Sequence, residues 1–227
     1  MRRTGSLPPR SLRGKGWGWG APARAPDSSA RIYTHSARDD RSDVIRRNGP
    51  PPVQLVPVGG VSQRLLRTLG DDLHASAGMQ CSVGEPMPLV EEWRVAESHL
   101  YRSGDLMQAL IASHGAGARS WTLAIADAGL CAAGVGPVFG EAAMDGCCAV
   151  IGLLPLRHGS GADADVLRGR LLTEALHELA HLDGADHCRR ESCVMYPSLH
   201  IADTDRKAAG FCDDCRRALK WRGLRKP

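Results

Sequence analysis

The sequence predicts a protein of the α/β class, in which one folded domain follows a basic N-terminal segment. Apolar runs of strand length alternate with segments of helical period, in the order strand, helix, strand, helix, strands, long helix. The length of 227 residues suits one domain with an extension. A histidine motif near the end of the last long helix places the candidate functional site there.

The folded domain is expected to begin near Val53. Residues 53–61, VQLVPVGGV, form an apolar run that predicts a strand ending in a Gly-Gly turn. Residues 62–76 place leucines at helical spacing, and Ser62 is the expected N-cap of that helix. Residues 79–98 are mixed in character and contain prolines, with room for one strand.

The middle of the domain predicts one more helix and two strands. Residues 103–114, SGDLMQALIASH, have the pattern of a helix, and residues 120–127, SWTLAIAD, that of a strong strand. A glycine-rich passage over residues 128–142 carries no element of its own in this prediction. The next strand is expected over residues 147–156.

The last part of the domain contains the long helix. Residues 158–164 indicate a loop, after which the helix begins at Asp165. Its apolar face consists of Leu167, Leu171, Leu172, Leu176 and Leu179. Only DCRRALKWRGL near the C-terminus then predicts a further short helix. We expect an upper subdomain over residues 53–184, a cysteine-rich lower subdomain over residues 185–227, and a cleft between them.

Charge is divided unevenly along the chain. Residues 1–52 hold eleven Lys and Arg against four Asp and Glu, whereas the remainder holds eighteen against twenty-one. The formal charge of +4 therefore comes from the N-terminal segment, and the mildly acidic domain argues against nucleic acid as a partner. We expect residues 1–52 to be disordered. An organelle transit peptide, or a translation start near Val44 or Val53, stays open for the same segment.

No apolar run in the sequence is long enough to cross a membrane. The N-terminal segment also lacks the apolar core of a secretory signal. We therefore expect a cytoplasmic protein without a membrane partner, and a monomer.

Residues 177–188, HELAHLDGADHC, contain the pattern HExxHxxGxxH. Positions i and i+4 share one face of a helix, so His177 and His181 can bind one metal ion together. Gly184 permits the turn that brings His187 back as a third ligand. Three histidines leave the fourth position of a tetrahedral zinc open, which is typical of a catalytic site. Glu178 is the candidate general base beside that position.

Four further cysteines, Cys188, Cys193, Cys212 and Cys215, follow the motif closely, whereas the other four are scattered among apolar residues. In a chain without a secretory signal, clustered thiols favour a metal over disulfides. Four thiolates suit a closed tetrahedral zinc, so we expect a structural ion that anchors the segment carrying His187. The prediction is two zinc ions per chain, one catalytic and one structural.

Met195, eight residues after His187, matches the Met-turn that lies beneath the histidine ligands of metzincin metalloproteases. With this methionine, the string from His177 to Cys215 resembles the C-terminal motifs of the archaemetzincins, a metzincin family of predicted zinc peptidases. Residues 123–140, LAIADAGLCAAGVGPVFG, are similar to a stretch of the same family.

The resemblance covers about residues 53–216 and also includes AVIGLLPLR and VPVGG, at 149–157 and 56–60. The chain departs from the family pattern at three positions, where an acidic residue, an aromatic residue and a lysine are usual: Gly129, Pro137 and Thr173. These departures concern the substrate cleft rather than the metal ligands.

The resemblance implies a compact metzincin-like zincin domain, with a mixed twisted sheet, an active-site helix and a zinc-stabilised C-terminal subdomain. It also implies hydrolysis of peptide bonds, hence a peptide or protein substrate, which the strand near residues 138–140 would align by backbone pairing. Zinc would lower the pKa of its bound water and polarise the scissile carbonyl. Glu178 would take the proton of that water and pass it to the leaving amine.

Two other functions fit parts of the pattern. A non-catalytic zinc module that binds peptides or partners would need no general base, and the presence of Glu178 argues against it. Some metal-dependent endoribonucleases carry a related histidine spacing without the glutamate. The presence of Glu178, Met195 and the four cysteines, together with the acidic domain, argues against that class.

Several polar residues near the motif receive lesser roles. Asp183 and Asp186 are expected to be solvated, or to orient the ligand imidazoles. Tyr196 is offset by one position from the tyrosine that reaches zinc in some metzincins, so it receives no metal role. His158 and His200 are expected at the surface.

Overall fold

The computed structural model describes residues 49–114, 120–144, 146–159 and 163–220. All of these belong to one contact unit, Ile45–Pro227. The predictions for residues 1–48 and for the last seven residues lie outside the described part of the chain. The division into upper and lower subdomains at residue 184 stays a prediction.

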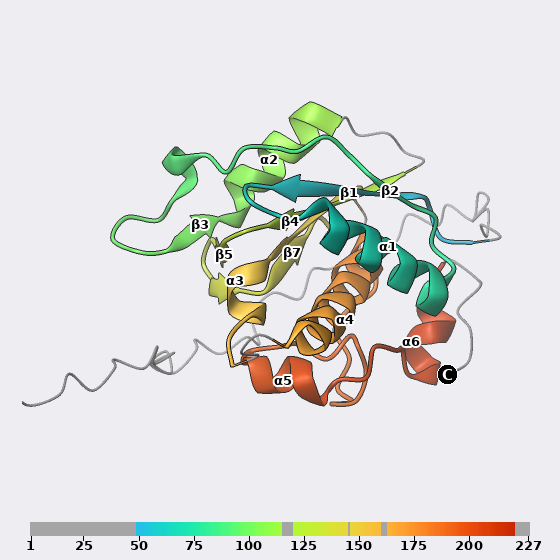
Figure 1. Cartoon of the computed structure of the whole chain (residues 1–227). Coiled ribbons are helices and arrows are strands. Elements are labelled where there is room, and N and C mark those ends of the chain that lie inside the picture. The colour runs from blue at the N-terminus through green and yellow to red at the C-terminus, as the bar shows by residue number, and fades with distance from the viewer. Residues whose placement is uncertain (1–48, 115–119, 145, 160–162, 221–227) are drawn as a thin grey trace, which may run out of the picture. The chain divides into compact units, whose positions relative to one another are not determined.

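A five-stranded sheet forms the centre of the domain, in the order β2-β1-β4-β8-β7 (Figure 1). The first four strands run parallel, and β7 runs antiparallel to β8 at one edge. The strands span Val53–Val58 (β1), Cys81–Val83 (β2), Trp121–Ala126 (β4), Gly140–Ala142 (β7) and Cys148–Gly152 (β8). The predicted mixed sheet and the α/β class are therefore confirmed.

Helices cover both faces of this sheet, with α2 on one face and α1 and α4 on the other (Figure 1). They span Gln63–Ala77 (α1), Ser103–His114 (α2) and Ala164–Leu182 (α4). Every residue of β4 and β8 is buried, as expected for parallel strands between two helical layers. Because side chains alternate along a strand, Leu55 contacts the α1 and α4 layer, whereas Val56 contacts α2.

The N-terminal elements agree with the sequence prediction. Ser62 caps α1, because its side chain accepts a hydrogen bond from the backbone N–H of Arg64 at 3.2 Å. Gly78 ends that helix in the left-handed conformation, at φ 69°. The second helix occupies the predicted residues.

The glycine-rich passage contributes three strands, whereas its local pattern predicts none and the family resemblance implies one near residues 138–140. β5 (Gly129–Ala132) and β6 (Gly136–Val138) form a small second sheet with β3 (Leu100–Arg102), and β7 joins the main sheet. The partners of β5 and β7 lie in distant segments, so the local pattern does not reveal them. A single turn of 3-10 helix, η1 (Glu91–Trp93), precedes β3.

The strand expected over residues 147–156 ends earlier, at Gly152. The next residues form a short helix, α3 (Leu153–Leu156), and Leu154 N–H donates to the Ala128 carbonyl at 3.1 Å. A β-carbon on Gly152 would lie 2.7 Å from that carbonyl oxygen, so a glycine is needed where the chain leaves the sheet.

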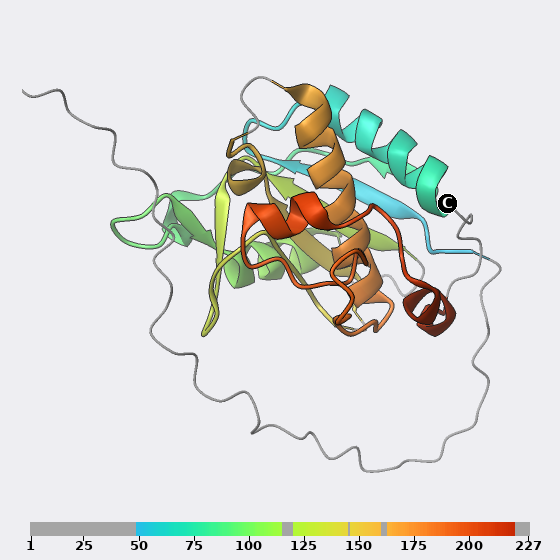
Figure 2. The same ribbon diagram turned by 90° about the horizontal axis from the view of Figure 1, so that it is seen from below.

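The C-terminal segment lies across α4 on the side away from the sheet (Figures 1 and 2). It contains α5 (Ile201–Arg206), which the sequence did not predict, and α6 (Asp213–Ala218), the expected short helix. Backbone bonds from Ala208 to Ser192 and from Val194 to Gly210 hold the two limbs of this segment together, at 3.1 and 2.9 Å. Among the described residues, no helix has the length and apolar character needed to cross a membrane.

Candidate zinc centres and active site

The site is built on the last three turns of α4, which are buried between the sheet and the C-terminal segment. From Arg170 to Leu182 nearly every side chain is buried, including charged and polar ones. Glu174, His177 and His181 lie at helical spacing along this stretch, so they share one side of the helix. The apolar leucines of α4 pack into the core beneath the sheet.

Gly184 ends α4 and turns the chain toward the third histidine. Its φ of 88° lies in the left-handed region. Its N–H donates to the His181 carbonyl at 2.9 Å, and the Ala185 N–H donates to the Ala180 carbonyl at 3.0 Å. These two bonds make a Schellman motif. The turn that the sequence assigned to Gly184 is therefore present.

The tautomers of His177 and His181 follow from their partners. Nδ1 of His177 lies 2.8 Å from the Val194 carbonyl, and Nδ1 of His181 lies 2.7 Å from the Ala185 carbonyl. Because a carbonyl only accepts, each Nδ1 carries the proton, and in the neutral rings each Nε2 presents a lone pair. The two Nε2 atoms are 3.1 Å apart. Two lone pairs that converge so closely fit a cation between them.

His187 completes this set, because the ligand atoms of the three histidines all lie within 4.8 Å of one another. His187 is exposed, whereas the other two imidazoles are buried. Burial, followed by the nearby Lys207 charge, lowers the pKa of both His177 and His187. Neutral imidazoles are the form that binds metal, and three nitrogen donors suit zinc with one open position.

Glu178 directly follows His177 on α4, and its side chain is buried. Burial, assisted by the neighbouring charges of Glu174 and Glu141, raises the pKa of Glu178 well above its usual value. The edge strand β7 approaches this side chain closely. A β-carbon on Gly140 would lie 2.5 Å from Oε1 of Glu178, so only glycine leaves the carboxyl its present position. Sequence reasoning placed Gly140 near the substrate but missed this contact.

The four C-terminal cysteines form a second set, with all sulfur atoms within 4.8 Å of one another. All eight cysteines lie in the described ranges and are free thiols, as a metal rather than a disulfide framework requires. Backbone N–H groups of Arg190 and Cys212 donate to the sulfurs of Cys188 and Cys193, each at 3.4 Å. Such bonds stabilise thiolates, so the donor set fits a closed tetrahedral zinc.

One thiol of this set has an unusually low pKa. Burial alone would raise the pKa of Cys212. Hydrogen bonds from the Cys215 backbone and from neighbouring thiols outweigh this effect and lower the pKa to about 7. The pKa of Cys215, in contrast, is raised, mainly by burial and then by its hydrogen bond with Cys212. A cluster that already stabilises one thiolate in this way favours binding of a cation.

Met195 lies between the two donor sets. It is fully buried and belongs to the same core as Leu176 and Ala180 of α4. Its carbonyl accepts a hydrogen bond from the Cys188 N–H at 2.8 Å, and the preceding Val194 carbonyl accepts from His177. The segment around Met195 therefore joins the cysteine set to the histidine set.

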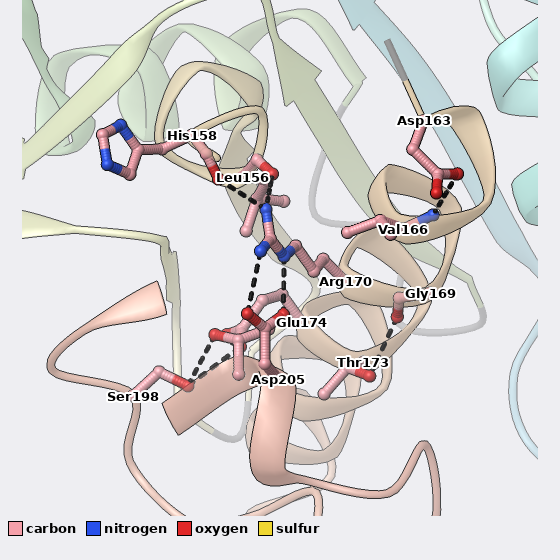
Figure 3. A network of polar contacts seen from close by, with 11 residues as sticks. Leu156, His158, Asp163, Val166, Gly169, Arg170, Thr173, Glu174, Ser198 and Asp205 are labelled. Atoms are coloured by element: carbon pink, nitrogen blue, oxygen red, sulfur yellow. Dashed lines mark hydrogen bonds and ion pairs between the residues drawn. The ribbon is translucent and has the colours of Figure 1, made fainter. Parts of the chain in front are cut away.

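Two ion pairs, which the sequence did not single out, connect α4 to the C-terminal segment. Arg170 forms a bidentate pair with Asp205 at 2.6 and 2.8 Å and also donates to two carbonyls near α3 (Figure 3). Glu174 pairs with Lys207 at 3.1 Å, and both side chains are almost wholly buried. The sequence could have pointed to Glu174, because it is a charged residue on the buried side of α4. No sequence feature pointed to Lys207.

The lesser polar residues take structural positions. Asp183 accepts a hydrogen bond from the Lys220 backbone at 2.5 Å, so it anchors the end of the described chain. Asp186 is exposed near His181 and His187. The Tyr196 carbonyl accepts from Lys207. His158 and His200 are exposed, as expected.

Residues 117–221 match the sequence model of Peptidase family M54. The chain is 32% identical over 173 residues to an archaemetzincin of Methanocaldococcus jannaschii, covering 75% of this chain and 93% of that protein. It is 29% identical to an archaemetzincin of Thermococcus kodakarensis, covering 74% of this chain and 94% of the relative.

Two solved archaemetzincin structures also resemble this chain. A crystal structure of archaemetzincin from Archaeoglobus fulgidus, complexed with malonate, superposes with a TM-score of 0.64 at 26% identity, covering 74% of this chain and 99% of that one. The archaemetzincin structure from Methanopyrus kandleri has a TM-score of 0.64 at 24% identity, covering 74% and 94%, and supports the fold alone.

Proposed function

The chain belongs to the archaemetzincins and matches Peptidase family M54, and from this premise we propose that it cleaves peptide bonds with Glu178 as general base. Family membership makes it a zinc metallopeptidase, that is, a hydrolase. The observations that carry the finer proposal are the buried carboxyl of Glu178, the residue next to His177, and the convergence of the His177 and His181 Nε2 atoms at 3.1 Å.

Two zinc ions per chain belong to the proposal. His177, His181 and His187 would hold the catalytic ion, and the cysteines would hold the structural one: Cys188, Cys193, Cys212 and Cys215. Zinc at the histidines supplies Lewis acidity toward the scissile carbonyl and the attacking water. The Val194 and Ala185 carbonyls hold two of the imidazoles in the orientation and tautomer that binding needs.

Glu178 moves the proton in this proposal. Burial raises the pKa of its carboxyl, which makes the carboxylate a stronger base than an exposed glutamate. The carboxylate accepts the proton of the attacking water and passes it to the nitrogen of the leaving amine. Because Gly140 has no side chain, the carboxyl of Glu178 can lie against β7 in the position from which it would accept this proton.

The substrate class is a peptide or protein chain. β7 stands at the edge of the main sheet, and β8 is its only strand partner within the described residues. The outer edge of a strand offers backbone N–H and C=O groups to an extended peptide. In support of this alignment, Gly140 of the same strand lies against Glu178.

The test uses the full chain with a mixed peptide library, with and without a chelator. The wild type is expected to cleave and to lose activity with chelator, while Glu178→Gln keeps both zincs and loses hydrolysis. Glu191→Gln, at an exposed glutamate, is the matched control and keeps full activity. Cleavage by Glu178→Gln would refute the general-base role. A zinc-loaded wild type that binds peptides but cuts none would favour the non-catalytic module.

A further inference from the structure

A buried ion pair joins Glu174 of α4 to Lys207 of the C-terminal segment. Oε1 of Glu174 accepts from Thr204 Oγ1 at 2.9 Å and from Ser198 Oγ at 3.0 Å (Figure 3), and it pairs with Lys207 Nζ at 3.1 Å. The side chains of Glu174 and Lys207 are 2% and 0% exposed. Glu174 stands one turn before Glu178 on α4, so the pair belongs to the active-site helix.

The same ammonium group also reaches the chain around Met195. Lys207 Nζ donates to the Tyr196 carbonyl at 3.0 Å. Two residues earlier, the Val194 carbonyl accepts from Nδ1 of His177 at 2.8 Å. The helix therefore contacts the short segment 194–196 twice, once through the imidazole of His177 and once through Glu174 and Lys207.

Stability alone is a poor explanation for such a pair. Two buried charges lose their hydration, and replacing a buried ion pair by apolar side chains of similar size is often neutral or stabilising. Because its ammonium also binds a carbonyl of a neighbouring segment, such a pair fixes the position of that segment. This position matters when the segment orients a metal ligand.

We propose that Glu174 and Lys207 are positioning residues for the catalytic zinc site: together they hold segment 194–196 against α4, so that the Val194 carbonyl orients the imidazole of His177. The inference rests on the proposed role of the three histidines as zinc ligands. It does not depend on Glu178 acting as the base, because zinc binding can be measured without turnover.

Electrostatics and positioning make opposite predictions for Lys207. Its positive charge acts on all three imidazoles of the histidine set. If charge were its only effect, removing the ammonium would strengthen zinc binding, because a cation near a cation site repels it. If it positions segment 194–196, removing it weakens zinc binding although the repulsion is gone.

The experiment compares three variants of the full chain: Lys207→Met, the double variant Glu174→Leu/Lys207→Met, and Arg170→Met as control. Arg170 is a buried cation of the same helix that pairs with the partly exposed Asp205 of α5, and its printed hydrogen bonds go to Asp205, Leu156 and His158 rather than to segment 194–196. Zinc affinity of the histidine site is measured by competition with a chelator, alongside Tm, the visible spectrum of cobalt at that site, and kcat against KM.

We expect Lys207→Met to lower both Tm and zinc affinity, the affinity by roughly 10- to 100-fold. The double variant should regain Tm, because no unpaired charge stays buried, but not the affinity or the cobalt spectrum. Arg170→Met should lower Tm and keep the affinity of the wild type.

Either of two results would overturn the proposal: Lys207→Met binding zinc as tightly as the wild type, or the double variant regaining affinity together with Tm. A loss of hydrolysis in the Glu178→Gln test leaves these measurements unaffected. If the histidine site of the wild type failed to bind zinc, the proposed metal site itself would fall, and this proposal with it.

Discussion

At the scale of single residues, the contact between Gly140 and Glu178 sets the position of the proposed base. The carboxyl is buried, its pKa is raised by that burial, and the backbone of β7 occupies the space beside it. A base is most effective when it is held within hydrogen-bond reach of the proton that it removes. Two substitutions test this position and this pKa separately.

Gly140→Ala should reduce kcat by roughly 100-fold, because a displacement of about 1 Å at the base costs that much. The new methyl group would lie 2.5 Å from Oε1 of Glu178. Zinc content should stay at the wild-type level. Gly104→Ala is the matched control, since no atom lies within 4 Å of its added β-carbon. Steady-state kinetics on a fluorogenic peptide decide the matter, and an unchanged kcat would refute the contact.

The raised pKa of Glu178 predicts a pH dependence of stability once the histidine-site zinc has been removed. A raised folded-state pKa favours the neutral acid, so its contribution to stability is full below the unfolded pKa of about 4.3 and is lost as pH rises through the folded value. Glu178→Gln stays neutral throughout. The Tm of Glu178→Gln minus that of the wild type should therefore increase as pH rises above the unfolded pKa of about 4.3. Parallel Tm curves would contradict the raised pKa.

At the scale of elements, the sequence of α4 both sets the ends of the helix and supplies residues of the proposed site. Asp163 caps its start by accepting from the N–H groups of Asp165 and Val166, and Gly184 ends it in a left-handed turn. Between these ends, the helix carries two of the proposed zinc ligands, His177 and His181, and the proposed base, Glu178. The turn then determines whether His187 reaches the other two imidazoles.

Two glycines near and within α4 should respond oppositely to alanine. Gly184→Ala should cost about 1 kcal/mol and weaken zinc binding, because alanine is strained at φ 88°. Gly169→Ala, in mid-helix with open space around it, should gain about 0.5–1 kcal/mol and leave zinc binding unchanged. Denaturant unfolding and chelator competition measure both effects. Equal responses would mean that the turn does not hold His187.

At the scale of the whole molecule, the two donor sets are parts of one arrangement. Cys188 directly follows His187, and its N–H binds the Met195 carbonyl. Cys193, Val194 and Met195 belong to the same hydrophobic core as α4. The cysteine cluster therefore holds both the third histidine and the carbonyl that orients the first.

This arrangement predicts a one-way dependence between the two zincs. Cys212→Ser with Cys215→Ser should remove the structural ion and also weaken binding at the histidines, because the segment of His187 and Val194 loses its anchor. His177→Ala should lose only the catalytic ion. Metal analysis of the purified variants is the measurement. A cysteine variant that keeps full affinity at the histidine site would show that the two sites are independent.

Local spacing predicted much of the site. The HExxHxxGxxH string places His177 and His181 through helical geometry alone, and the glycine at position 184 predicts the turn that ends the helix. The same holds for the start of α1, where Ser62 is the predicted and observed N-cap. In each instance the deciding interactions lie within a few residues of one another, so the sequence states them directly.

The tertiary structure decided what depends on distant partners. β5 and β7 exist because strands from elsewhere in the chain pair with them, although their own residues are rich in glycine. The contact of Gly140 with Glu178 and the pair of Glu174 with Lys207 join segments that folding alone brings together. Sequence by itself thus identified the proposed ligands and the proposed base of this protein through local backbone geometry. Long-range packing determined what surrounds and supports them, because burial and pairing arise only when distant segments meet.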